Sequence, residues 1–378
     1  MKKALVFLFA FALTVTYSPA SAQISSKDNV LELIRKVNNY WQEHNRPQCR
    51  SFWDNAAYFT GNQDAYEITG DEAYLKYALD WATFNRWQGA RQQDESKWEY
   101  QTYGEDHNHV LFADWQICFQ VYIDLYKAEH RTERIERALH VMNWQAKSKQ
   151  TDYWWWADAL YMGMPVFTKL YTVTHDERLL DKQYECFRWT DSLLFDKETH
   201  LYYRDGKYVY PKVKTACNEG KSFWARGDGW VLAGLAKVLK DLPKDSKYRP
   251  LYVQRFRELA QAVASCQHGE GYWSRSMLCE DDAPGYETSG TAFFTYGMLW
   301  GVNNGILSKK EFMPVIDRAW KYLTTIALQD DGSIGYVQPI GEKPDPTRTV
   351  DSKSQAPFGT GAWLLAACEY YRSLNQNK

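Results

Sequence analysis

The sequence predicts an all-α fold, an (α/α)6 toroid or barrel in which six helical hairpins close into a ring. Three observations lead to this prediction. Apolar residues recur with the period of amphipathic helices along most of the chain, whereas the two-residue alternation of strands is scarce. Tight polar turns separate pairs of helical segments at five places. A last helical segment, at residues 361–374, completes the sixth hairpin.

The helices follow in order along the chain. The first is expected over residues 29–44, where Leu31, Leu33, Ile34 and Val37 share one face. Each hairpin that follows consists of a helix end, a short polar turn and the start of another helix. These hairpins are expected within residues 65–75, 122–135, 170–180, 239–248 and 302–308.

The spacing of the turns favours a ring over an open stack. They lie at intervals of roughly 45 to 70 residues, longer than the roughly 34 to 47 residues of ordinary helical repeats, so long connections must join the hairpins. An open stack would need polar capping repeats, whereas a closed ring covers its inner helices without them. The long connections of such a ring gather at one end, where we expect the binding residues.

The first 22 residues are typical of a secretory signal peptide. Lys2 and Lys3 precede an apolar run that ends near residue 15, and small residues precede Gln23. We therefore predict a signal peptide at residues 1–22 and an exported protein, periplasmic in a Gram-negative source or otherwise secreted. No composition break divides residues 23–378, which are expected to form a single domain. The apolar run is too short to span a bilayer, and no membrane anchor is expected.

The charge balance argues against a nucleic-acid partner. Lysine and arginine total 45 against 47 aspartate and glutamate residues, a net charge of −2 with both signs interspersed. No phosphate-binding glycine loop is present, and no cofactor is predicted. His107 and His109 lack the further ligands of a metal motif, so no metal site is predicted. Seven scattered cysteines leave at least one free thiol and leave open whether a disulfide forms.

Aromatic residues are the strongest compositional signal. The chain has 17 Trp, 27 Tyr and 17 Phe, which make up 16% of its residues. Flat aromatic faces pack in cores, and they also stack on the C–H faces of sugar rings. This composition indicates a carbohydrate as the binding partner.

Asp158 is the leading candidate for a catalytic acid. It follows the run of tryptophans at residues 154–156 and precedes a predicted helix. Burial among such residues disfavours the ionised carboxylate and raises its pKa, which keeps a proton available near neutral pH. The alternative is a structural role, in which Asp158 caps the helix or pairs with an arginine.

Asp114 is the second candidate. It opens the helix that runs to Tyr126, and a helix N-terminus favours the ionised carboxylate, although local capping would explain the residue equally well. Both aspartates introduce helices at the same predicted end of the ring. We therefore expect two carboxyls with opposite pKa tendencies to converge there.

Arg226 stands between Trp224 and Trp230 in a glycine-rich segment. Its guanidinium suits bidentate binding of a substrate carboxylate, and Trp230 offers a stacking face. Alternatively, Arg226 pairs with Asp228 or Asp205 and braces a loop.

These motifs resemble glycoside hydrolase family 105, the unsaturated rhamnogalacturonyl hydrolases, and the related unsaturated glucuronyl hydrolases of family 88. The most specific matches are Trp-x-Asp-x-Leu-x-Met at residues 156–162 and Trp-x-Arg-Gly-x-Gly-Trp at residues 224–230. The resemblance runs from about residue 53 to residue 371. It is supported by further matches at residues 113–126, 201–203 and 358–362. It implies the same barrel of six hairpins.

The resemblance also implies roles for individual residues. Asp158 matches the proton donor of the family, and Asp114 matches its second essential carboxylate. Many members carry histidine after the Tyr-Tyr pair, where this chain has Arg204. The residues expected to contact the substrate are Trp53, His109, Trp155, Tyr203, Arg204, Trp224, Arg226 and Trp230.

The implied activity is that of an exo-acting unsaturated uronyl hydrolase. Its partner is an oligosaccharide whose non-reducing end carries the unsaturated uronic acid left by a polysaccharide lyase. Asp158 would protonate C4 of the C4=C5 double bond, water would attack C5, and the glycosidic bond would then fall apart. We favour the rhamnogalacturonyl over the glucuronyl type. The alternatives are an ordinary inverting glycosidase or a sugar epimerase on the same fold, and a non-catalytic periplasmic glycan-binding protein.

Overall fold

The computed structural model describes residues 26–374. The predicted signal peptide lies outside these residues. Within them the regular structure is helical, and β-pairing is limited to isolated bridges. The predicted all-α class is confirmed.

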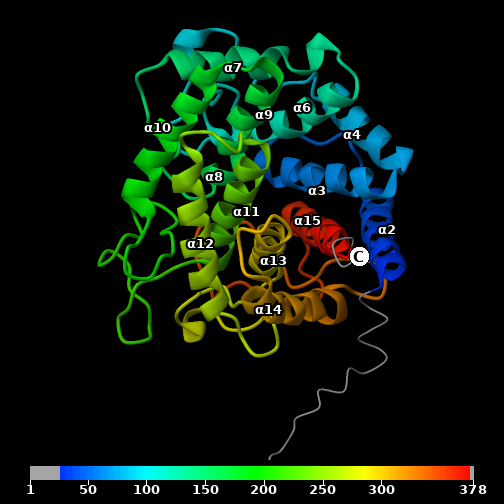
Figure 1. Ribbon diagram of the computed structural model, residues 1–378, viewed down its shortest axis with the longest axis vertical. Helices are drawn as coiled ribbons and strands as arrows, with labels where there is room; N and C mark the ends of the chain where they lie inside the picture. Colours follow the sequence, from blue (N-terminus) through cyan, green and yellow to red (C-terminus); the bar gives the residue numbers. More distant parts are fainter. Residues whose placement is uncertain (1–25, 375–378) are drawn as a thin grey trace, which may run out of the picture.

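Six inner helices form a closed ring (Figure 1). Each packs on the next along the chain, and the last packs on the first, which confirms the predicted toroid. The inner helices are α3 (Trp53–Thr69), α6 (Cys118–Ala128), α9 (Met164–Thr174), α11 (Ala225–Asp241), α13 (Thr288–Asn303) and α15 (Pro357–Ser373).

Six outer helices cover this ring (Figure 1). They are amphipathic, as α10 illustrates by burying Leu180 and Phe187 while its other face meets solvent. The inner helices are instead buried on nearly all sides. The outer helices are α2 (Lys27–His44), α4 (Glu72–Phe84), α7 (Glu136–Lys147), α10 (Glu177–Leu194), α12 (Arg249–Ser265) and α14 (Lys309–Tyr322).

The five predicted turns connect inner to outer helices, and their local chemistry explains why they could be recognised. Helix α3 ends at Gly70, which adopts a left-handed conformation, and Asp71 then caps α4 through the backbone N–H of Ala73. His175 and Asp176 repeat this arrangement between α9 and α10. Each pair ends one helix and starts the next within two residues.

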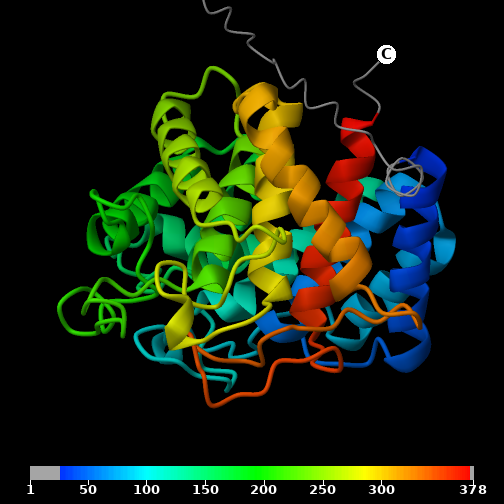
Figure 2. The ribbon, with the colours of Figure 1, turned by 90° about the horizontal axis from the view of Figure 1, so that it is seen from below.

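The long connections gather at the opposite end of the ring (Figure 2). Two of them end in single helical turns, α5 (Ala113–Gln116) and α8 (Ala159–Met162), which lead into α6 and α9. A disulfide between Cys217 and Cys279 joins two other connections, which answers the question that the cysteine spacing left open. The site is therefore expected among these loops.

The ring closes through a close approach of α3 and α15. A Cβ atom added to Gly361 would lie 2.4 Å from the carbonyl oxygen of Ala57, and one added to Gly61 would lie 2.3 Å from that of Gly361. Side chains larger than hydrogen are excluded at both positions. Glycine is required here because the two backbones touch.

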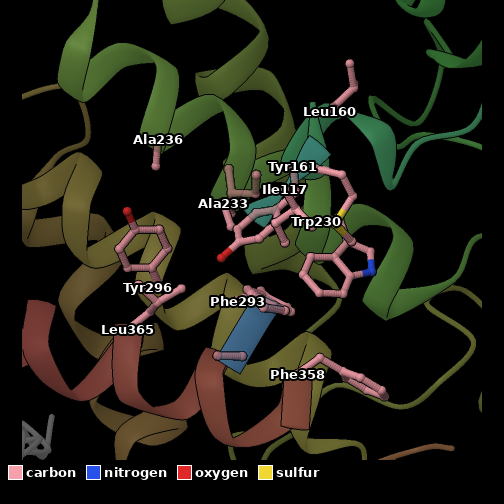
Figure 3. Close-up of a cluster of buried hydrophobic side chains, with 14 of the residues drawn as sticks. Ile117, Leu160, Tyr161, Trp230, Ala233, Ala236, Phe293, Tyr296, Phe358 and Leu365 are labelled. Atoms are coloured by element: carbon pink, nitrogen blue, oxygen red, sulfur yellow. The ribbon is translucent and has the colours of Figure 1, made fainter. Parts of the chain in front are cut away.

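Aromatic rings fill the centre of the toroid (Figure 3). Trp230 packs with its ring centroid 4.8 Å from that of Tyr161 and 4.2 Å from that of Phe293. Phe358 borders the same cluster at the start of α15. None of the helices in residues 26–374 is both long and apolar enough to cross a membrane.

Candidate active site

A cavity of about 320 Å³ opens among the long connections. It is lined by helix starts and by loop residues that come from distant parts of the chain. The lining residues are Trp53, Tyr103, Asp114, Asp158, Met162, Arg204, Trp224, Arg226, Trp230, Ile340, Gly341 and Glu342.

The inner helices give this end of the ring a positive electrostatic character. Helices α3, α11 and α15 begin at the loop end, and no side chain caps their first turns (Figure 2). Their unpaired N–H groups carry partial positive charge, which favours an anionic group nearby. The cavity is therefore suited to a negatively charged ligand.

Asp158 lies directly before α8 and lines the cavity. A bridge between Trp156 and Asp205, together with a 2.7 Å hydrogen bond from Ala157 N to Arg204 O, holds the two segments side by side. Arg204 Nε donates to Oδ2 of Asp158 at 3.1 Å, whereas Oδ1 is buried without a hydrogen-bond partner. Burial raises the pKa of Asp158, although the positive charge of Arg204 opposes the rise. The pKa direction predicted from the sequence is confirmed.

Asp114 lies in the first turn of α5 and is also buried in the cavity wall. Burial raises its pKa well above the ordinary value, and the nearby charge of Asp158 raises it further. The prediction that this carboxyl favours its anion, opposite to Asp158, was therefore wrong. Helix α5 is a single turn, and its N-terminal dipole does not offset the loss of hydration. Burial therefore raises the pKa of both carboxyls.

Arg204 connects three carboxylates at the cavity wall. Besides Asp158, it donates from Nη1 to Oδ2 of Asp205 at 2.7 Å and to Oε2 of Glu342 at 3.4 Å. Its side chain is mostly buried. The arginine that departs from the family pattern therefore lies directly on the candidate acid.

Arg226 lines the cavity, but its hydrogen bonds differ from the predicted carboxylate clamp. It donates to the carbonyl oxygens of Gln338 at 2.6 Å and Pro339 at 2.9 Å, and it stacks over the rings of Trp224 and Phe358. Burial lowers the pKa of Arg226 to about 10. Arg226 thus anchors the loop between α14 and α15, so these two donors are already used by backbone.

The bracing pairs that were considered for Arg226 are not formed. Asp228 accepts a 2.8 Å hydrogen bond from Tyr202 N, and Asp205 pairs with Arg204.

Three predicted tryptophans form walls of the cavity. Trp53 stands edge-on to Trp230, with ring centroids 6.2 Å apart. Trp224 donates from Nε1 to Oε1 of Gln338 at 2.8 Å, which adds a second anchor for the same loop. The cavity is thus lined by Trp53, Trp224 and Trp230, three of the tryptophans that the sequence predicts as substrate contacts.

Three other predicted contact residues lie outside the lining of this cavity. His109 is buried with Nδ1 3.0 Å from Oδ2 of Asp106, and Tyr203 donates its hydroxyl to Oδ2 of Asp196 at 3.0 Å. Both are held by neighbouring loop residues. Trp155 lines a separate groove beside the cavity.

Sequence reasoning missed part of the wall. Tyr103 lies in the same long connection as His109, but it is not among the contacts predicted from the sequence. Ile340, Gly341 and Glu342 lie in the connection between α14 and α15, which was not considered. The length of that connection, together with its place at the loop end, is the signal that would have indicated it. Residues 26–374 contain no group of three or more His, Cys, Asp or Glu residues arranged to hold a metal ion.

Two buried carboxyls among tryptophan rings at the loop end of an α/α toroid are an arrangement that suits a glycoside hydrolase. The comparison with protein families agrees with this class and identifies one family within it. The chain belongs to glycosyl hydrolase family 88, whose sequence profile matches residues 26–374. The expectation of this family and its relative, family 105, is confirmed.

Individual relatives are similar over most of the chain. A Formosa agariphila protein named unsaturated 3S-rhamnoglycuronyl hydrolase is 32% identical, covering 84% of this chain and 83% of the relative. A solved structure described as a glycosyl hydrolase family 88 protein from Bacteroides vulgatus is 51% identical, with a TM-score of 0.89 and coverage of 92% and 99%. Another solved structure, described as a polysaccharide lyase, is 56% identical, with a TM-score of 0.90 and coverage of 93% and 99%.

Proposed function

We propose that this glycoside hydrolase is an exo-acting unsaturated uronyl hydrolase. It hydrates the C4=C5 double bond of an unsaturated uronic acid at the non-reducing end of an oligosaccharide that a lyase has produced. The observation that carries the proposal concerns Asp158, a buried carboxyl in the cavity wall whose pKa is raised and whose Oδ1 has no hydrogen-bond partner in the protein. Such a group can deliver a proton to carbon.

The substrate double bond is part of an enol ether and is conjugated to the carboxylate. Protonation of C4 by Asp158 leaves positive charge on C5 that the ring oxygen shares. Water adds to C5, and the ionised Asp158 takes the proton that this water loses, so the acid is restored. The resulting hemiketal opens to a 5-keto sugar and releases the remaining oligosaccharide. No nucleophile attacks the anomeric carbon, so the carboxyl spacing of ordinary glycosidases is not required.

Asp114 and Arg204 have supporting roles in this proposal. Because burial favours the protonated form of Asp114, its carboxyl is a hydrogen-bond donor that orients the sugar beside Asp158. Arg204 and the helix N-termini supply positive charge for the substrate carboxylate.

We further propose that the sugar released from the uronic acid is rhamnose. The relative from Formosa agariphila is named for a rhamnoglycuronyl substrate, which supports this assignment. The galacturonic origin of the unsaturated residue, favoured over a glucuronic origin, stays a prediction.

A panel of lyase products from pectin, glycosaminoglycan and arabinogalactan tests the proposal through the ultraviolet absorbance of the alkene. We expect the absorbance to fall with unsaturated oligosaccharides and the 5-keto product to appear. An ordinary inverting glycosidase would instead cleave saturated glycosides and leave the alkene intact. An epimerase would change neither absorbance nor chain length.

The same assay separates two further activities. A polysaccharide lyase, as one similar structure is described, would form alkenes from the polymer and so raise the absorbance. A glycan-binding protein would leave all substrates unchanged, the Asp158→Asn variant and the native protein would both show only background activity, and sugar affinity would be the only measurable property. We also propose that the protein acts in the periplasm or outside the cell, which fractionation of the source cells would test.

A further inference from the structure

A second hollow lies beside the catalytic cavity, with a volume of about 680 Å³ and a wide opening to solvent. We propose that it is a distal subsite, which binds an anionic sugar of a substrate longer than a disaccharide. The proposal rests on the proposed function, because its ligand is the far part of the same oligosaccharide. The groove is lined by Gln101, Trp155, Leu193, Asp205, Gly206, Lys207 and Lys212.

The groove adjoins the catalytic site, because residues that contact one another line the two hollows. Arg204, in the cavity wall, donates to Asp205 in the groove wall at 2.7 Å. Nζ of Lys207, in the groove wall, lies 3.0 Å from Oε2 of Glu342 in the cavity wall. One network of ion pairs therefore lies between the two hollows, and in this proposal the substrate chain crosses it from the cavity to the groove.

Trp155 gives the groove a surface suited to a sugar ring. Its indole Nε1 donates to the carbonyl oxygen of Tyr100 at 2.9 Å, and its ring packs 4.5 Å from that of Trp156. These contacts fix the ring while part of it remains accessible. Leu193, which is 37% exposed, adds an apolar surface in the same lining. Trp155 also stacks with Phe112 at a centroid distance of 6.2 Å, so its ring is fixed on the protein side while it remains only half-buried.

Lys212 supplies the unpaired positive charge of the groove, because Nζ of Lys207 already lies 3.0 Å from Oε2 of Glu342 and 3.8 Å from Oδ2 of Asp205. The carboxylate of Asp205 is buried and paired with Arg204, so it contributes little negative potential at the surface. Lys212 donates once to the carbonyl oxygen of Gly206, and an ammonium group has three donors. The remaining donors suit the oxygens of a sulfate ester or a carboxylate.

Chain-length dependence tests the proposal. The substrates are an unsaturated disaccharide and an unsaturated tetrasaccharide with sulfate beyond the second sugar. We expect the native enzyme to have a KM roughly tenfold lower for the tetrasaccharide, as burial of part of one sugar face implies. Trp155→Ala and the double variant Lys207→Ala/Lys212→Ala should each raise KM more for the tetrasaccharide than for the disaccharide. Lys214→Ala, an exposed lysine of the same loop outside the groove, is the matched control.

Calorimetric binding to the Asp158→Asn variant keeps this test separate from the proposed function. If no lyase product is hydrated, the proposed function fails, and binding still reports on the groove. If desulfation of the tetrasaccharide lowers its affinity, sulfate is the group that the lysines bind. If the desulfated tetrasaccharide keeps its affinity and the double lysine variant loses it, the lysines bind a carboxylate. Equal affinity for disaccharide and tetrasaccharide would overturn the subsite. If Trp155→Ala lowered the affinity for the disaccharide and the tetrasaccharide equally, the ring would have only a structural role. That result would also overturn the proposed subsite.

Discussion

Arg204 binds one oxygen of the candidate acid Asp158 and leaves the other without a partner. The guanidinium Nε lies 3.1 Å from Oδ2, while Oδ1 is buried with no hydrogen bond. Burial raises the pKa of this carboxyl and the arginine charge lowers it, with burial the larger effect. The proton affinity of the acid is thus a balance between two identifiable contributions, and each can be changed separately.

Replacing Asp158 with asparagine should lower kcat on unsaturated oligosaccharides by about 10² to 10⁴-fold, the usual contribution of a general acid. The asparagine keeps the size of the side chain but cannot donate a proton to carbon. The absorbance assay measures the loss, and circular dichroism checks the fold. Asp80→Asn, an exposed carboxylate on α4, should keep native activity. Native-like turnover by Asp158→Asn would assign the proton transfer to another group.

Replacing Arg204 with glutamine should shift the pH profile of kcat/KM. Asp158 must be protonated to act, so activity is present below its pKa and is lost as pH rises through it. Because Arg204 lowers that pKa, its removal raises it, and the descending limb should move to higher pH. Lys221→Gln, which changes an ion pair with Asp196 outside the cavity, should not move the limb. A shift to lower pH would contradict this account.

Replacing Asp114 with asparagine should stabilise the fold near neutral pH while activity falls. The pKa of Asp114 is higher in the folded than in the unfolded protein, so its favourable contribution exists at low pH and is lost as pH rises through the folded pKa. Asparagine is neutral throughout and does not show this loss. Thermal unfolding should give a higher Tm than native near neutral pH and a similar Tm at about pH 4. A lower Tm near neutral pH would show that the carboxylate is stabilised by contacts.

Replacing Gly361 with alanine should destabilise the ring by about 1 to 3 kcal/mol, because the added methyl group overlaps the backbone of α3. Denaturant unfolding measures the difference. Gly269→Ala is the control, since no atom lies within 4 Å of its added Cβ, and its effect should stay within about 0.5 kcal/mol. Equal stability of the two variants would mean that α3 and α15 separate at little cost.

The fold could be predicted because its determinants are local. Turn residues such as Gly70 and Asp71 end and start helices through contacts with their own neighbours. Amphipathic periodicity then distinguishes outer helices, and the turn spacing indicates long loops at one end. Each of these features is visible within a few consecutive residues.

The site was predictable only where local context decides it. Asp158 follows three tryptophans, so its burial could be inferred. The partners of Arg226 are the carbonyl oxygens of Gln338 and Pro339, which lie more than a hundred residues away in the sequence. No pattern near Arg226 in the sequence predicts these contacts. The pKa of Asp114 depends on desolvation by the assembled ring, which exceeds the effect of its helix turn. Long-range packing, rather than residue type, determined these outcomes.

The contact between α15 and α3 has a topological consequence. Helix α15 also packs on α2, the first helix within residues 26–374, so the start and the finish of the toroid are neighbours in space (Figure 1). Each hairpin then has two adjoining hairpins, and none is physically terminal. A circularly permuted chain, with the old ends joined and new ends placed in the short turn at Asn304 and Gly305, would retain every pairwise helix packing of the original.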